Sequence, residues 1–566
     1  MVSCMISAHL LILFFSGYNR SSMLLFLRKW ESLAVLSLAL AIIIIDSTIL
    51  NVSLGTIIRE FHTDIQSLQW VITAYALVLA ALTITGGRLG DLLGRKRMFM
   101  TGAILFAIGS FITAVSTSIP VMLLGESLIE GIGAAIMLPA TASLIVANYQ
   151  GHDRAVAFGF WGGIAGAASA IGPLLGGYLT TTYSWRWGFL INVFIVVILL
   201  LGSILIKESR DTEEKPTLDW TGVFLSAIGL LGIVFGIIES SQYGWWVVKD
   251  HFVIFNKMIE PFGLSLVPFS ITIGILFLIA FFLWEQHMEK QKKTPLVSLS
   301  IFRNITFTAG VLTITIISFE QIGMIFALPV FLQSVLRLNA FQTGLALLPF
   351  SLAFLIAAPL AGIFSNKFPP KYIILSGLFF NVLGLFLLRM SISQTDNILS
   401  LSPAMLVMGI GMGMVMAQIS NMTLSAVSIQ QVGEASGVNN TMRQVGSSLG
   451  AAIIGAALLS SLGVNISAGI EKSMIIPSAA KQQIAHMVSQ QTSSIEFGSG
   501  LHVGNNTSPY IVSEIKKITN DATVIATKES LFYAILVACL GFLTGMLLPN
   551  TKPHLQKPEK QQATTE

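Results

Sequence analysis

The sequence predicts an all-α protein that crosses a membrane fourteen times. Hydrophobic residues make up 54% of its 566 residues and charged residues only 11%, and the mean hydropathy is +0.78. A soluble protein of this size would carry about 25% charged residues. Fourteen stretches are apolar and reach the length of about 20 residues that a transmembrane helix needs. Most Lys and Arg residues of the short connecting segments fall in the segments on one side of the membrane, as expected of a multi-pass protein.

The predicted spans follow one another along almost the whole chain. They lie near 33–58, 68–87, 98–118, 121–147, 155–180, 187–206, 217–239, 263–284, 305–334, 342–365, 371–390, 401–427, 434–462 and 529–548. Basic residues gather in 20–29, 88–97, 207–215 and 290–303. The positive-inside rule therefore places both termini in the cytoplasm. We expect the chain to lie in the cytoplasmic (inner) membrane of a bacterium.

Spans 7 and 8 separate two halves of six spans each. The predicted organisation is a cytoplasmic tail, a first six-helix bundle, two additional spans with linkers, a second six-helix bundle and a second tail, at 1–32, 33–206, 207–303, 304–548 and 549–566. The stretch His9 to Tyr18 has no basic residue before it and does not resemble a signal peptide. A start at Met23, which would remove this stretch, is favoured over an additional span. The polar loop 463–528 has two interpretations, a poorly ordered connector or a small extracytoplasmic element near the substrate exit.

The loop GGRLGDLLGRKR, residues 86–97, combines glycines for a tight turn with Asp91 and a basic cluster. It resembles the signature between spans 2 and 3 of the major facilitator superfamily of secondary transporters. The segment GIFSNKFPPK, residues 362–371, resembles a degenerate copy of this loop in the second half, as repeated halves predict. The resemblance implies the major facilitator fold, two six-helix bundles plus two additional central helices, and a gating loop formed by Gly87, Arg88, Gly90, Asp91, Gly94, Arg95 and Lys96.

Ionisable residues inside the spans are candidates for proton coupling, because such groups are costly in a membrane. Asp46 lies in DSTILNV, which resembles the Asp-x-Thr-x-x-Asn-Val signature of fourteen-span drug:proton antiporters. Glu126 and Glu130 share one helix face, and two carboxylates so close cannot both ionise cheaply. Ser127 stands where the superfamily usually has Arg and Glu130 where it has Gln, which moves the predicted proton site to the glutamates. Glu320 is a further candidate, and for all of these helix packing is the alternative.

Other motifs supply candidates for the substrate cavity, the hinge and a charge pair. Asn51, Gln69, Tyr75 and Trp161 are assigned to the substrate cavity, although an interfacial aromatic belt would explain the outer end of span 2 equally well. The run GPLLGG in span 5 resembles the Gly-Pro-x-x-Gly-Gly motif of exporters. That resemblance implies a hinge made of Gly166, Gly172, Pro173, Gly176 and Gly177. Arg443 is expected to pair with Asp91 or another acidic residue near the cytoplasmic side.

The absence of certain motifs argues against ATP-driven transport, covalent catalysis, metal binding and nucleic-acid binding. It contains no phosphate-binding loop, no nucleophile–base pattern, no His/Cys/carboxylate cluster with metal-site spacing and no basic–aromatic tract for nucleic acid. We therefore expect no enzyme, no cofactor and no metal, with protons as the coupling ion. The predicted function is proton-coupled export of amphiphilic or cationic small molecules, with the substrate and the lipid bilayer as partners and a periplasmic adaptor left open. The alternatives are an exporter of one metabolite, such as a siderophore, peptide or lipid, and a non-transporting receptor.

Overall fold

The computed structural model describes residues 20–63, 65–209, 218–249, 251–254, 257–258, 261–338, 340–393, 398–477, 481 and 509–550. Within these ranges fourteen helices are long and apolar enough to cross a membrane, which confirms the predicted number. Residues 1–19 and 551–566 of the two predicted tails lie outside the described residues, and so does most of the centre of loop 463–528.

The first half is built from α2 Arg20–Phe61, α3 Ile65–Leu93, α4 Arg95–Ala114, α5 Ile119–Met122, η1 Leu123–Glu130, α6 Gly131–Asn148, α7 Gly151–Thr182 and α8 Arg186–Gly202. The additional spans are α9 Trp220–Tyr243 and α10 Leu266–Lys290, with β1 Val253–Ile254 and β2 Lys257–Met258 paired antiparallel between them. The second half contains α11 Ile305–Ser334, α12 Ala340–Phe364, α13 Pro370–Ser391, α14 Ile398–Leu424, α15 Val432–Lys472 and α18 Pro509–Met546. Short turns occur at η2 Ser203–Leu205, η3 Pro261–Gly263, η4 Leu299–Arg303 and η5 Ile429–Gln431.

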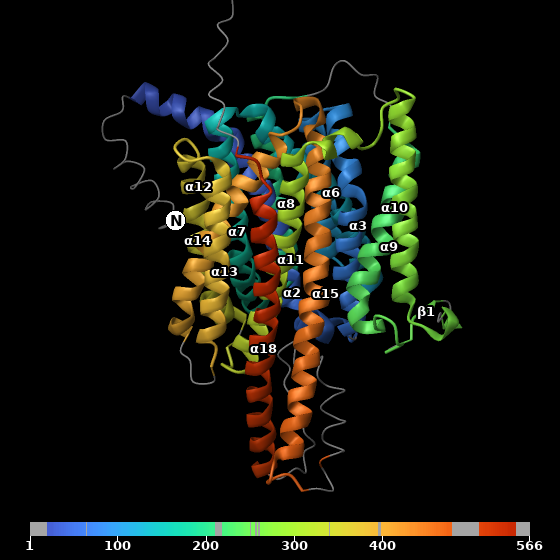
Figure 1. Cartoon of the computed structure of the whole chain (residues 1–566), viewed down its shortest axis with the longest axis vertical. Helices are drawn as coiled ribbons and strands as arrows, with labels where there is room; N and C mark the ends of the chain where they lie inside the picture. The colour runs from blue at the N-terminus through green and yellow to red at the C-terminus, as the bar shows by residue number, and fades with distance from the viewer. Residues whose placement is uncertain are drawn as a thin grey trace, which may run out of the picture.

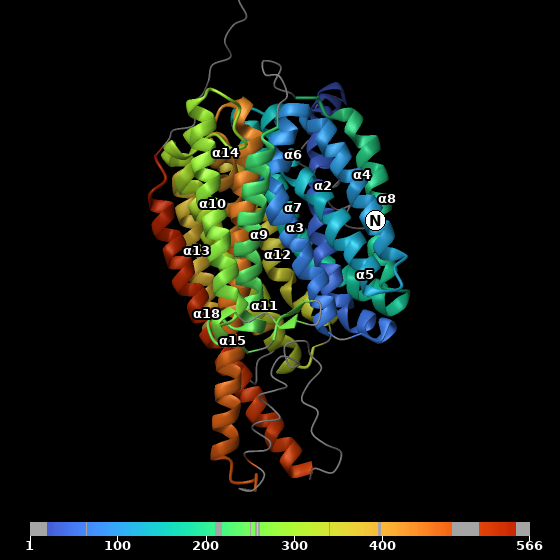
Figure 2. The same ribbon diagram turned by 90° about the vertical axis from the view of Figure 1, so that its right-hand side faces the viewer.

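The two halves stand side by side, and the additional pair covers one edge of the contact between them (Figure 2). Helix α9 packs against α3 of the first half and α15 of the second, while α10 packs mainly on α9. The pair is therefore central in the sequence but peripheral in space. Many apolar side chains of α10 are exposed, such as Ile273, Leu276 and Leu283, as expected for a helix that faces lipid.

Two helix pairs form the most extensive contacts between the halves, α7 with α12 and α3 with α15, and glycines bring both pairs close. A Cβ atom on Gly159 would lie 2.6 Å from the carbonyl oxygen of Ala358, and one on Gly362 would lie 2.8 Å from that of Ala155. On the other side, a Cβ atom on Gly437 would lie 2.9 Å from the Cα atom of Ile84. Small residues allow this backbone-to-backbone approach in a membrane.

The glycines of the predicted hinge serve two different contacts. Gly166 faces the ring of Phe354 on α12, so it belongs to the contact between the halves. Gly172 and Gly176 instead face Thr48 and Ile49 of α2, within the first half. Gly177 is buried nearby, and Pro173 lies inside the unbroken helix α7. Whether this segment bends during function stays a prediction.

Most of the described part of loop 463–528 is helical, so its interpretation as a poorly ordered connector is wrong for these residues. Helix α15 continues to Lys472 and α18 already begins at Pro509, so both project together beyond the bundle (Figure 1). Their contact is apolar, with Leu462, Ile466, Ile470, Ile515 and Ile518 in one cluster. We call this projecting pair the hairpin. The apolar periodicity of the two hairpin helices is hard to recognise in the sequence because many Ser, Gln and Asn residues surround these segments.

The tight contact between α7 and α12 predicts that Gly159→Ala destabilises the protein. The added methyl group would meet the backbone of α12, and such overpacking costs about 1–3 kcal/mol. We expect a lower midpoint of thermal unfolding for the purified protein, measured by tryptophan fluorescence. Gly162→Ala is the matched control, because a Cβ atom there would meet its nearest neighbours at 3.7 Å, an ordinary contact. Equal midpoints for the two variants would contradict the packing argument.

Candidate functional site

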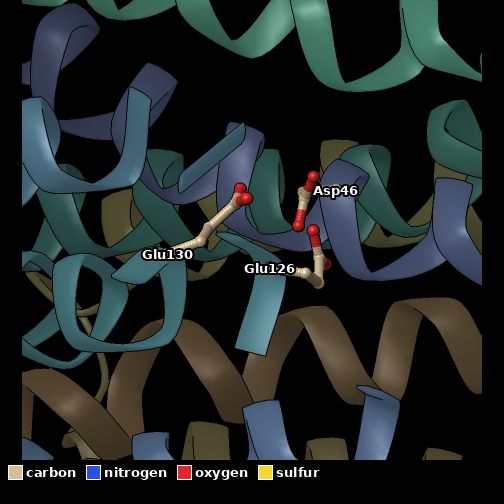
Figure 3. A group of neighbouring side chains, drawn as sticks. All are labelled: Asp46, Glu126 and Glu130. Atoms are coloured by element: carbon tan, nitrogen blue, oxygen red, sulfur yellow. The ribbon is translucent and has the colours of Figure 1, made fainter. Parts of the chain in front are cut away.

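Three carboxyl groups from two distant segments meet inside the first half. Asp46 comes from the middle of α2, and Glu126 and Glu130 come from η1 (Figure 3). One carboxyl oxygen of each lies within 4.8 Å of the others, and none of the three side chains is more than 1% exposed. We call them the carboxyl cluster. The carboxyl groups of Asp46 and Glu126 point toward each other, and Glu130 approaches from the next turn.

A local irregularity of the fourth span positions the two glutamates. Residues Leu123–Glu130 form a π-helix between α5 and α6, a rare feature that is frequent at functional sites. Helix α4 crosses this segment closely, because a Cβ atom on Gly109 would lie 2.5 Å from the backbone nitrogen of Glu130 and one on Gly125 would lie 2.7 Å from Thr113 Oγ1. This approach brings the hydroxyl groups of α4 to the carboxyl cluster.

Few hydrogen-bond donors reach the carboxyl cluster. Asn192 on α8 donates from Nδ2 to Asp46 Oδ1 at 2.6 Å, and also to Ser110 Oγ at 3.1 Å. Ser110 in turn donates to Glu130 Oε1 at 2.6 Å. The second oxygens of all three carboxyl groups have no partner among the described atoms. A carboxyl–carboxyl contact such as that of Asp46 with Glu126 is a hydrogen bond only when one group carries a proton.

This arrangement can bind and release a positively charged ion. An unpaired negative charge at this depth costs several kcal/mol, so a proton on the cluster relieves the cost. The sequence shows no cluster with metal-site spacing, but folding brings Asp46 to two glutamates that are far from it in the sequence. The expectation that no metal binds stays a prediction. Carboxylate oxygens suit hard cations, so the cluster can hold such a cation as well as a proton.

The other predicted cavity and coupling residues are distributed over both halves. Tyr75 on α3 lies within electrostatic reach of all three acids of the cluster, and its hydroxyl group has no partner among the described residues. Trp161 on α7 is buried with its Nε1 equally unpaired in that set. Glu320 lies apart from the cluster, in the second half, where Asn381 Nδ2 donates to it at 2.8 Å. The side chains of Asn51 and Gln69 lie outside the described residues.

The predicted gating loop joins the two halves at one end of the bundle, which we call the basic end because it carries Arg88, Arg95, Lys96 and Arg97. The carboxylate of Asp91 accepts the backbone N–H groups of Gly433 and Glu434 at 3.1 and 3.0 Å, in the first turn of α15. A carboxylate is stabilised at that position by the helix dipole. Arg95 also donates to Asp91, at 2.8 Å from Nη2. The halves are therefore closed against each other at this end.

Glycines and a further acid complete the turn of this loop. Gly94 has a φ angle of 109°, a conformation that favours glycine, and its N–H group donates to the carbonyl oxygen of Gly90 at 3.1 Å. Helix α4 begins directly afterwards. Glu208 accepts the N–H groups of Lys96 and Arg97 at 3.0 and 3.2 Å and so caps α4.

Arg443 does not form the predicted pair with Asp91. Asp91 already has its donors in Arg95 and in the first turn of α15, whereas Arg443 lies ten residues further along that helix, about 15 Å away along its axis. No ion pair of Arg443 with an acidic residue exists within the described part of the chain.

Three residues of this site were missed from the sequence. Asn192 stands inside a recognisable motif, SWRWGFLINV, which was a usable signal. Ser110 and Glu208 carry no such signal, because a serine in an apolar span and a glutamate in a linker are both common. Only the crossing of α4 with η1 and the path of the linker after α8 place them.

Known proteins of similar sequence and structure are membrane transporters. The chain matches the Major Facilitator Superfamily over residues 36–451. It is 28% identical to the "Multidrug resistance protein Stp" of Mycobacterium tuberculosis, over 79% of each chain. It is 26% identical to the "Tetracenomycin C resistance and export protein" of Streptomyces glaucescens, over 77% of each. The solved proton:xylose symporter XylE has a similar fold, with a TM-score of 0.53 and 14% identity over 95% of this chain and 98% of the other.

The contact at the basic end predicts that Asp91→Asn opens it. The amide lacks the charge that Arg95 and the first turn of α15 stabilise, and hydrogen bonds to charged groups contribute about 1.5–3 kcal/mol. With Cys4 and Cys539 replaced by Ser, spin labels at the exposed Leu93 and Ile429 should report longer distances in the variant. Asp153→Asn is the control, because its ion pair with Lys29 lies at the same end but within the first half. An unchanged distance distribution would show that this contact does not hold the halves together.

Proposed function

The chain belongs to the Major Facilitator Superfamily, and from this premise we propose that it exports amphiphilic or cationic small molecules in exchange for protons. Relatives that carry the names multidrug resistance protein, multidrug efflux pump and resistance and export protein support this substrate class. The single observation that carries the coupling is the carboxyl cluster, three buried acids that no basic group among the described residues neutralises.

We further propose that the basic end faces the cytoplasm of a bacterial inner membrane. The cluster of Arg88, Arg95, Lys96 and Arg97 is the densest group of basic residues between two spans, and such short loops stay on the cytoplasmic side. The hairpin then projects on the opposite side. With this orientation, the closed basic end corresponds to a protein whose interior is shut off from the cytoplasm.

Alternating access follows from the two glycine-lined contacts between the halves. In transporters built from repeated halves, one half rocks against the other around a site near the middle of the membrane. Opening toward the cytoplasm requires the first turn of α15 to leave Asp91. When the basic end closes again, the hydrogen bonds between Asp91 and the first turn of α15 form again. The basic end therefore switches between an open and a closed arrangement.

The carboxyl cluster would link this movement to the proton gradient. Protons arriving from outside neutralise the acids and remove the attraction for a cationic substrate, which then leaves. Release of the protons toward the cytoplasm restores the negative charge and the attraction. Each proton that moves inward contributes about 2.3 kcal/mol per 100 mV of membrane potential, enough to support an outward gradient of substrate.

Proton coupling predicts a specific defect for Glu126→Gln. The amide resembles the protonated acid but cannot release a proton, so ethidium efflux driven by a pH gradient in proteoliposomes should fall at least tenfold. Asp46→Asn should weaken both ethidium binding and efflux, because Asp46 accepts the Asn192 bond that holds the cluster together. Glu320→Gln is the comparison, since Glu320 is equally buried but belongs to the second half.

Several results would contradict the proposal. Full activity of Glu126→Gln together with loss of efflux in Glu320→Gln would indicate that the coupling proton binds in the second half. Efflux that requires sodium or a divalent cation and ignores the pH gradient would make the cluster a metal site. Transport of a single compound from a broad panel would indicate an exporter of one metabolite.

A further inference from the structure

Arg443 points into the interior of the protein. It lies seven residues, two helical turns, after Ser436, so the two share one face of α15. Ser436 donates to the carbonyl oxygen of Pro139 on α6 at 3.2 Å, which fixes that face toward the first half. The neighbouring Met442 and Val445 pack against an apolar cluster that contains residues of both halves. Arg443 is therefore directed between the halves and not toward lipid.

Arg443 also lies at about the depth of the carboxyl cluster. Helices α3 and α15 run antiparallel, with Gly437 against Ile84. Six residues further along α15 and six back along α3, about 9 Å on each helix, place Arg443 level with Val78. Val78 contacts Gly131, next to Glu130. The two halves thus present three acids on one side and a guanidinium group on the other, near the same level of the membrane.

The guanidinium group of Arg443 has no acidic partner within the described ranges. None of the ion pairs among the described residues involves it. Glu434 lies on the opposite face of α15, nine residues before, and accepts the N–H group of Ser298 at 3.2 Å. The side chain of Arg443 is half-buried and keeps some accessible surface. Arginine stays charged in proteins, and an unpaired charge at this depth is costly.

We propose that Arg443 binds an acidic group of the substrate, a carboxylate or a phenolate, on the second-half side of the cavity. The planar guanidinium group donates two parallel hydrogen bonds to a carboxylate, a geometry that a lone positive charge does not offer. An amphiphile with an acidic group at one end and a cationic part at the other matches the opposite charges that the two halves present, Arg443 in one and the carboxyl cluster in the other. This inference rests on the proposed export function and extends its substrates to zwitterionic amphiphiles.

A pair of dyes that differ in one group tests this assignment. A rhodamine with a free carboxylate and the methyl ester of the same rhodamine share their cationic ring system, and only the first carries an acidic group. Dissociation constants of both dyes would be measured by fluorescence anisotropy with the purified full-length protein. Arg443→Gln should weaken binding of the acid at least about tenfold and leave the ester within about twofold. Lys367→Gln removes an exposed positive charge outside the cavity and should change neither value.

The retained affinity for the ester shows at the same time that the variant is folded. Arg443→Lys keeps the charge without the planar donor pair, so its affinity for the acid should lie between those of the wild type and Arg443→Gln. Equal weakening of both dyes, or of neither, would overturn the inference, as would a wild-type protein that binds and exports only the ester. In that last case the proposed export function stands. A wild-type protein that exports neither dye nor ethidium would instead overturn the proposed function itself.

Discussion

Three buried carboxyl groups within 4.8 Å of one another cannot all be ionised cheaply, and much of the first half is arranged around that constraint. The π-helical segment turns Glu126 and Glu130 toward α2, and the glycines at the crossing of α4 with η1 let Ser110 approach. Asn192 extends the same network from α8. Because these donors are neutral, they orient the acids without cancelling their charge. Among the described residues, no ion pair neutralises the cluster.

Asp91 differs from the acids of the carboxyl cluster because it is a buried acid with a cationic partner. Its carboxylate accepts two backbone N–H groups of α15 and the guanidinium group of Arg95, so its charge is fully compensated. Such a group stabilises one arrangement of the halves. The contrast separates an acid that is paired across the contact between the halves from three acids that have no ion-pair partner among the described residues.

The number and order of the spans could be predicted because each depends on a local run of apolar residues. The acids of the cluster could be named one by one, since a charged residue in such a run is conspicuous. Their convergence could not, because Asp46 and Glu126 meet only through the packing of α2 on the fourth span. The partners of Arg443 were predicted wrongly for a similar reason. Its depth is set by where α15 begins, and that helix starts at Val432 and extends far beyond the apolar stretch.

Helix α15 is a single rod of 41 residues, about 60 Å long, and its two ends lie on opposite sides of the bundle. One end holds Asp91 and the other forms half of the hairpin. A rigid rod that tilts by about ten degrees around its middle moves each end by about 5 Å, in opposite directions. The tip of the hairpin therefore moves whenever α15 tilts to release Asp91. A fluorophore near the fully exposed Met474 would therefore report the release of Asp91, which takes place on the opposite side of the membrane.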